Sequence, residues 1–172
     1  MEAMEMLMQR RSIRKYKDQP VEEEKLDAIL QAGMYAPTGM GAQSPLMVAI
    51  TNQELVRKIA KMNAAVMNSD GDPFYGAPAV IIVFADTNRR TYQYDGSCVM
   101  TNLLNAAYAN GLGSCWIHRA KEVFESEEGK ALMKEWGVPE SYVGIGNCIL
   151  GYMDGELPLA KDRKENYIIK VK

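Results

Sequence analysis

The chain has 172 residues, 47% of them hydrophobic and 24% charged, which is typical of a globular protein and predicts one domain over 1–172. Its 20 basic and 22 acidic side chains give a formal net charge of −2, so we expect no nucleic-acid partner. The longest apolar run, 77–85, is far shorter than the roughly 20 residues of a membrane helix, and 2–11 has no signal-peptide order, which predicts a cytoplasmic protein without a membrane partner.

Apolar spacing and turn-forming residues divide the chain into helices and strands. In chain order we expect helices over 2–9 and 21–34, a strand over 46–50, a helix over 55–66, a strand over 79–84, a helix over 94–110, a strand over 113–117, helices over 121–125 and 128–136, and strands over 142–151 and 167–171. Strands that alternate with helices indicate an α/β or α+β sheet protein.

Local signals add detail to this pattern. The sequence from Thr51 to Glu54 matches a capping box before the third helix. The run 79–84 is continuous and rich in β-branched residues, which is typical of a strand buried on both faces. Gly111 stands where the long helix should be capped. The segment 157–172 is rich in basic residues, and we expect that it need not fold back onto its own chain.

The cysteines and the single histidine exclude two classes of site. Cys98, Cys115 and Cys148 lie far apart in apolar stretches and form no CxxC pair, so we interpret them as buried, reduced thiols. With His118 as the only histidine, a structural zinc site and a catalytic triad are both disfavoured.

A basic cluster follows the first expected helix. Arg10, Arg11, Ser12 and Arg14 place three guanidinium groups and a hydroxyl within five residues. Guanidinium groups match phosphate oxygens two bonds at a time. Lys161 and Arg163 form a second basic pair near the C-terminus. Each cluster taken alone fits an ordinary solvated surface as well as a phosphate site.

The loop 38–43 contains two glycines, which allow the backbone to approach a planar ligand closely. It lacks the third glycine of a dinucleotide-binding fingerprint, and it follows an expected helix rather than a strand. We therefore reject a Rossmann fold.

The basic cluster, read as Arg10 to Tyr16, resembles the opening motif R-R-S-x-R-x-[FY] of the FMN-dependent nitroreductase family. Further matches follow in the family's order along nearly the whole chain. They are 36–40 with Gln43, 76–78, Asp95 with 102–104, Ala107, 111–115, 144–151 and 161–163.

This resemblance implies an α+β fold in which helices flank a central mixed sheet, and an interlocked homodimer with FMN at the subunit interface. The segment 157–172 would then pack on the partner subunit. The resemblance also implies which residues bind FMN. The phosphate would be held by Arg10, Ser12, Lys161 and Arg163, with Arg11 in the same cluster. Arg14 would lie toward the pyrimidine side of the ring, where a cation stabilises the reduced flavin.

The resemblance implies that the rest of the flavin site comes from two further segments. Pro37, Thr38, Gly39 and Gln43 would reach the ring from the partner subunit. Trp116, Ile117 and His118 would pass the ring with their backbone amides. We interpret His118 as lining the pocket, and expect no catalytic side chain, because the flavin carries the hydride chemistry.

Two features depart from the family pattern. Gly41 stands where the family's loop usually has an asparagine, so we expect one side-chain hydrogen bond to the flavin to be missing or to be replaced by a water. The connection between Asp86 and the long helix is short, whereas larger members carry helices there that cover the substrate. We therefore expect a more open pocket.

The resemblance implies an oxidoreductase that takes a hydride from NAD(P)H and reduces an acceptor by a ping-pong mechanism. Nitroaromatics, quinones and free flavins are the candidate acceptors. A flavin-binding dimer that stores FMN or carries electrons without substrate turnover is the alternative. Relatives of this fold also dehalogenate aromatics or fragment flavin, but no motif in the sequence indicates those activities.

Overall fold

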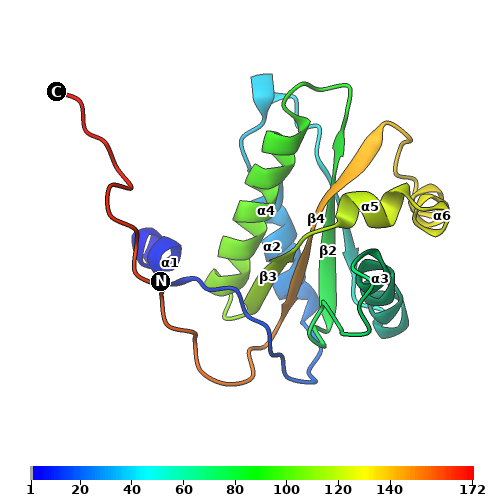
Figure 1. The fold of residues 1–172 in the computed structure, drawn as a ribbon, viewed down its shortest axis with the longest axis horizontal. Coiled ribbons are helices and arrows are strands. Elements are labelled where there is room, and N and C mark those ends of the chain that lie inside the picture. Colours follow the sequence, from blue (N-terminus) through cyan, green and yellow to red (C-terminus); the bar gives the residue numbers. More distant parts are fainter. Residues whose placement is uncertain (1) are drawn as a thin grey trace.

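The computed structural model describes residues 2–172 and contains one sheet between two layers of helices (Figure 1). The elements in chain order are α1 (Ala3–Gln9), α2 (Glu23–Met34), the 3₁₀ turn η1 (Gly39–Gly41), β1 (Leu46–Ile50), α3 (Gln53–Val66), β2 (Ala79–Asp86), α4 (Tyr92–Ala109), β3 (Gly113–Ile117), α5 (Ala120–Glu125), α6 (Glu127–Glu135) and β4 (Tyr142–Gly151). The strand order is β1-β2-β4-β3.

The sheet confirms the expected α+β class, but parallel pairing among the described residues contributes only an isolated bridge to it. All three pairs of neighbouring strands are antiparallel. The one parallel pairing in the described part of the chain is an isolated bridge between Ser12 and Ser114. The longest pairing is that of the central strands β2 and β4, which extends from Ala79 opposite Leu150 to Asp86 opposite Tyr142.

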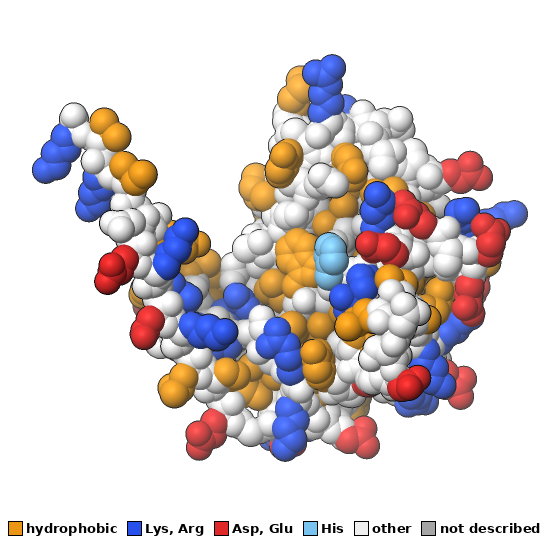
Figure 2. All heavy atoms as spheres, viewed as in Figure 1, with side chains coloured by type: hydrophobic (Ala, Val, Ile, Leu, Met, Phe, Trp, Pro, Cys, Tyr) orange, Lys and Arg blue, Asp and Glu red, His pale blue; other side chains and the backbone are white. Residues whose placement is uncertain are grey.

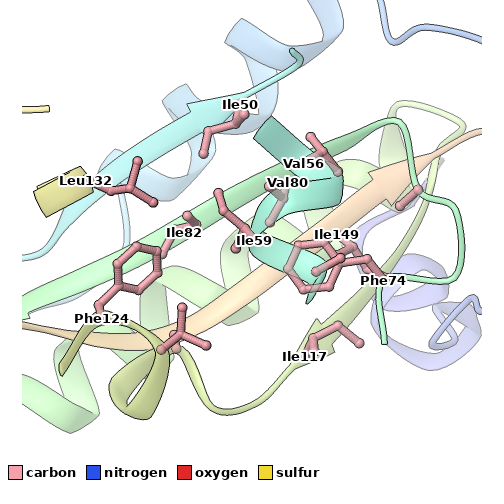
Figure 3. Packing of buried hydrophobic residues seen from close by; sticks show 14 of the residues in the cluster. Ile50, Val56, Ile59, Phe74, Val80, Ile82, Ile117, Phe124, Leu132 and Ile149 are labelled. Atoms are coloured by element: carbon pink, nitrogen blue, oxygen red, sulfur yellow. The ribbon is translucent and has the colours of Figure 1, made fainter. Parts of the chain in front are cut away.

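The core has two halves, one on each face of the sheet. Along β2, Val80, Ile82 and Phe84 belong to one buried cluster, whereas Ile81 and Val83 belong to the other. This alternation follows from the two-residue period of a strand. In Figure 1, α2 and α4 cover one face, and α3, α5 and α6 cover the other. Figure 3 shows the cluster that contains Val80 and Ile82, in which side chains from α3 and α5 point toward those of the sheet.

The expected bounds of three strands are confirmed, because β1, β3 and β4 cover 46–50, 113–117 and 142–151. Gly111 has a φ of +76° just after α4, as its capping role requires. The capping box expected at Thr51 is wrong by one residue. Asn52 is the cap, and its Oδ1 accepts a hydrogen bond from Leu55 N at 2.9 Å.

The last expected strand, over 167–171, is not formed. Residues 156–172 contain no helix or strand, and all of 158–172 are exposed. Ile169 and Val171 expose 87% and 93% of their surface. A strand needs a sheet edge to supply its hydrogen bonds, and this segment pairs with neither β1 nor β3, the two edge strands of the chain's own sheet. We call 156–172 the tail; it extends away from the rest of the chain (Figure 1).

None of the helices within 2–172 combines the length and the apolar character that crossing a bilayer requires.

Candidate functional site

The basic cluster is fixed against the end of the sheet by its own backbone. Ile13 N donates to Ser114 O at 2.9 Å, next to the bridge that pairs Ser12 with Ser114 on β3. The Ile13 side chain is buried, and it packs so closely on Gly113 that a Cβ there would lie 2.7 Å from Ile13 Cγ1. Ser12 and Arg14 flank this buried anchor, so their side chains project away from it.

A second set of contacts holds the segment that follows. Tyr16 forms an isolated bridge with Met153, and its hydroxyl donates to Ile13 O at 2.8 Å. Burial raises the pKa of Tyr16 far above its usual value, so this hydroxyl remains a proton donor. Lys17 N donates to Tyr152 O at 2.8 Å. The segment 12–17 is therefore held at both ends.

The cluster contains buried donors that lack partners. Arg10 Nη1 and Arg11 Nε are both inaccessible to solvent and have no hydrogen-bond partner among the described residues. Arg11 Nη1, by contrast, donates to Met8 O at 2.7 Å and to Arg10 O at 2.8 Å, at the end of α1. Unpaired buried donors on cations are costly unless an anion satisfies them. The cluster is thus suited to an anionic group.

Arg10 is close enough to the buried Cys148 on β4 to influence its pKa. Burial first, and then Cys115, raise the pKa of Cys148 to about 12, and the charge of Arg10 partly opposes this rise. Cys148 on β4 is the register partner of Trp116 on β3. Because Ser12 pairs with Ser114, two residues before Trp116 on β3, the basic cluster and the stretch 116–118 lie close together at this edge of the sheet.

A pocket of about 410 Å³ opens beside the basic cluster. One wall is formed by Arg14 and the stretch from Trp116 to Arg119, and the other by residues of the loop between α3 and β2, which include Asp72 and Tyr75. Its volume lies within the range of small-molecule sites. Figure 2 shows the single histidine at the surface, with basic side chains nearby on the same face. The structure thus brings Arg14, Trp116, Ile117 and His118 together.

Two buried asparagines fix the backbone of this wall. Asn63 on α3 donates through Nδ2 to His118 O at 2.8 Å. Asn147 on β4 donates to Ile117 O at 3.2 Å and to His118 O at 3.4 Å. Both side chains are fully buried. Arg119 follows in the left-handed region, with a φ of +71°, and its Nε donates to Asn63 Oδ1 at 3.1 Å.

The sequence analysis missed Asn63, Asn147 and Arg119. A signal was present for the two asparagines, since each is a polar residue inside an apolar stripe or strand, where a buried amide needs specific partners.

The loop with Pro37, Thr38, Gly39 and Gln43 forms a separate structure at the beginning of α4. Gly39 N donates to Asp95 Oδ1 at 2.9 Å, and Gln43 N donates to Thr38 Oγ1 at 3.0 Å. A Cβ at Gly39 would lie 2.4 Å from Thr91 Oγ1, so a larger residue would push the loop away. Pro37 and Gln43 remain exposed, which leaves them free to meet another molecule.

The loop and the basic cluster lie at different heights along α4. The loop bonds to Asp95, whereas Ser114, the partner of Ser12, donates through Oγ to Leu104 O at 3.4 Å. Asp95 and Leu104 are nine positions apart in α4, which at about 1.5 Å per residue separates them by about 14 Å along the axis. One chain therefore does not bring the two parts together.

The tail residues Lys161 and Arg163 are likewise not brought to the site. Both are exposed, and within residues 2–172 no hydrogen bond or ion pair joins them to Arg10 or Ser12. Within the same residues there is also no group of three or more His, Cys, Asp or Glu side chains that could hold a metal ion.

Comparisons with known proteins agree on one family. Residues 7–152 match the Nitroreductase family. A protein of Archaeoglobus fulgidus, named "Putative NADH dehydrogenase/NAD(P)H nitroreductase", is 32% identical over 172 residues that cover 96% of this chain and 90% of the relative.

Solved structures give the same result. A nitroreductase from Bacteroides fragilis with bound FMN superposes with a TM-score of 0.91 at 29% identity, over 100% of both chains. A nitroreductase from Desulfitobacterium hafniense, also with bound FMN, gives a TM-score of 0.87 at 25% identity over 100% of both chains.

Proposed function

This chain belongs to the nitroreductase family, and from that premise we propose that it is an FMN-dependent oxidoreductase that uses NAD(P)H to reduce small organic acceptors by a ping-pong mechanism. Nitroaromatics and quinones are the acceptors we expect. When bound, FMN supplies the hydride chemistry, accepting two electrons from the nicotinamide and passing them to the acceptor. The observation that carries the proposal is the pair of unpartnered, buried arginine donors beside the pocket lined by Arg14 and 116–118.

The residues present fit FMN at both of its ends. Arg10 Nη1 and Arg11 Nε are oriented toward no protein acceptor, and Ser12 adds a neutral hydroxyl donor beside them. A terminal phosphate would satisfy such a set with charge-assisted hydrogen bonds. The pocket supplies a space whose wall carries a cation, Arg14, and the indole of Trp116.

The chain's own contribution is position and charge. Arg14 places a positive charge beside the pyrimidine side of the ring, which favours the reduced, anionic flavin. The asparagine contacts to Ile117 O and His118 O fix the orientation of the strand end, so that its backbone N–H groups can donate to the ring edge. His118 is exposed and lines the pocket, and we assign it no proton-transfer role.

We propose a homodimer in which the second copy completes each site. The loop with Pro37, Thr38, Gly39 and Gln43 is separated from the basic cluster of its own chain, and the tail with Lys161 and Arg163 extends away from it. Both features are explained if the loop and the tail serve the partner subunit. We further propose that 1–172 is one domain and that the protein is cytoplasmic.

Turnover by the purified protein tests the function. We expect a yellow protein from which denaturation releases FMN, and which oxidises NADH or NADPH when a quinone or a nitroaromatic is added. Anaerobic mixing with each nicotinamide identifies the donor by the bleaching of the flavin band. A yellow protein that neither nicotinamide reduces would instead be a flavin store or carrier, and release of mainly FAD would contradict the phosphate assignment.

A further inference from the structure

The pocket wall carries more positive charge than the flavin accounts for. Among the residues that line it, Arg14 and Arg119 carry a positive charge, and Asp72 is the only acidic one. The carboxylate of Asp72 is already engaged by its own loop, since Oδ1 accepts from Phe74 N at 2.8 Å and Oδ2 from Gly76 N at 2.7 Å. The pocket is thus locally cationic in a chain whose net charge is −2.

The protein holds the Arg119 side chain in place through Nε and leaves its other donors unpaired among the described residues. Its Nε bonds to the buried Asn63, which also fixes the carbonyl of His118. A guanidinium group has five N–H donors. Within residues 2–172, neither Nη of Arg119 has a hydrogen-bond or ion-pair partner. The half-buried side chain therefore presents a pre-oriented pair of donors at the pocket wall.

Under the proposed function, the other cations near the pocket already contact FMN. Arg10, together with the neutral Ser12, is assigned to the phosphate, and Arg14 to the pyrimidine side of the ring. Arg119 lies on a different segment, at the N-cap position of α5 and two residues after the end of β3, and the proposed FMN contacts do not include its side chain. The connection from Asp86 to Tyr92 is short, so this chain has no additional helix there to cover the pocket.

We propose that Arg119 binds an anionic group of the acceptor, so that the enzyme prefers aromatic acceptors that carry a carboxylate. This inference rests on the proposed function. A planar guanidinium matches a carboxylate with two parallel hydrogen bonds, which also orients the aromatic ring that bears it. Asn63 is a positioning residue, because it holds Arg119 without reaching the acceptor itself.

A pair of acceptors of similar shape tests the proposal. In the holoenzyme, kcat/KM is measured for 4-nitrobenzoate and for the neutral 4-nitrobenzamide, and the ratio of the two values cancels effects common to both. We expect Arg119→Gln to lower this ratio about tenfold and Arg119→Lys to lower it less. Arg57→Gln removes an exposed arginine of α3 that does not line the pocket, and should leave the ratio unchanged.

A binding measurement keeps this test separate from turnover. Isothermal titration of the oxidised holoenzyme with benzoate and with benzamide should show that Arg119→Gln weakens benzoate about tenfold and benzamide little. This measurement decides the inference even if the protein shows no turnover, which would contradict only the proposed function. Equal changes for both acceptors and both ligands would overturn the inference, because Arg119 would then act on the flavin. A change confined to anaerobic reduction by NAD(P)H would also overturn it, and assign Arg119 to the dinucleotide.

Discussion

The two basic clusters look alike in sequence but differ completely in structure. Arg10, Ser12 and Arg14 lie on a segment that is held by bridges to Ser114 and Met153. Lys161 and Arg163 lie on the tail, whose side chains are exposed and which joins no sheet. The difference lies in the neighbours. The first segment has an apolar anchor, Ile13, and a glycine in β3 that admits it, whereas the apolar residues of the tail are exposed and pack on no part of their own sheet.

The contrast teaches that a binding cluster can be prepared in two ways. The N-terminal cluster is pre-organised, with buried donors that already lack partners. The tail cluster must be ordered by something outside its own chain. We expect the partner subunit to do this, so cofactor binding and dimer formation should depend on each other.

Removing the tail should have the largest effect. A chain that ends at Gly155 loses Lys161, Arg163 and all exposed apolar residues of the tail. We expect a colourless protein with a weakened dimer, because both the phosphate contacts and the inter-subunit contacts are lost together. Light scattering gives the mass, and absorbance gives the bound flavin. A truncated protein that remains a yellow dimer would show that the tail serves neither role.

Single arginines from the two clusters should have intermediate and similar effects. We expect Arg10→Ala and Arg163→Ala each to weaken FMN by about 10–100-fold, the range of one charge-assisted hydrogen bond of about 1.5–3 kcal/mol. Fluorescence titration of the apoprotein with FMN measures this.

The salt dependence sharpens the comparison. At low salt the unmodified protein should gain more affinity than either variant, because each variant lacks one cation. Arg57→Ala on α3 is the matched control and should bind FMN like the unmodified protein. If both cluster variants keep full affinity, the arginines are ordinary surface charges.

Periodicity predicted most elements of the fold, and even the bounds of β1, β3 and β4, because strands and helices buried within one chain leave a regular apolar pattern. The same reasoning failed for 167–171, which has the composition of a strand but pairs with neither edge strand of its own chain. The composition of a segment indicates its preference for the extended conformation, whereas strand pairing depends on which other strand lies next to the segment.

The site was predictable in part, and for a different reason. The residues of the basic cluster and of 116–118 were named through a family resemblance. The structure places Arg14 and 116–118 around one pocket, and their binding of FMN stays a prediction. Arg119 and Asn63 were not found. Their contact joins positions 56 apart in the chain, and no local pattern encodes a pairing of that kind.

Arg14 should affect the potential of the flavin more than its affinity. Under the proposed function, replacing Arg14 with Gln removes the cation beside the reduced ring, while the proposed phosphate contacts of Arg10 and Ser12 remain. We expect the two-electron potential to fall by about 30 mV, which corresponds to about 1.4 kcal/mol. Equilibrium titration against a reference dye measures the shift. A potential unchanged within error would mean that Arg14 points away from the ring.

The smallest effect should come from the ion pair that joins Lys15, just after the N-terminal basic cluster, to Asp154, just before the tail. Lys15 Nζ lies 2.7 Å from Asp154 Oδ2, and Asp154 N donates to Lys15 O at 3.1 Å. The hydrogen bond from Lys15, and then its charge, hold the pKa of Asp154 below its usual value of 3.8. A carboxyl whose pKa is lowered by folding stabilises the protein above its unfolded pKa, and this contribution is lost as the pH falls through the folded pKa.

Asp154→Asn should therefore lower the urea midpoint slightly at pH 7, because the pair is exposed and screened by solvent. The difference from the unmodified protein should shrink in high salt and vanish in acid, below the lowered pKa of Asp154, where the carboxyl of the unmodified protein is neutral as well. Lys121→Gln breaks a comparable exposed pair with Glu125 within α5, away from the tail, and is the control for a general effect of charge removal. A midpoint difference that persists unchanged in acid would show that Asp154 acts through its backbone and side-chain shape rather than through its charge.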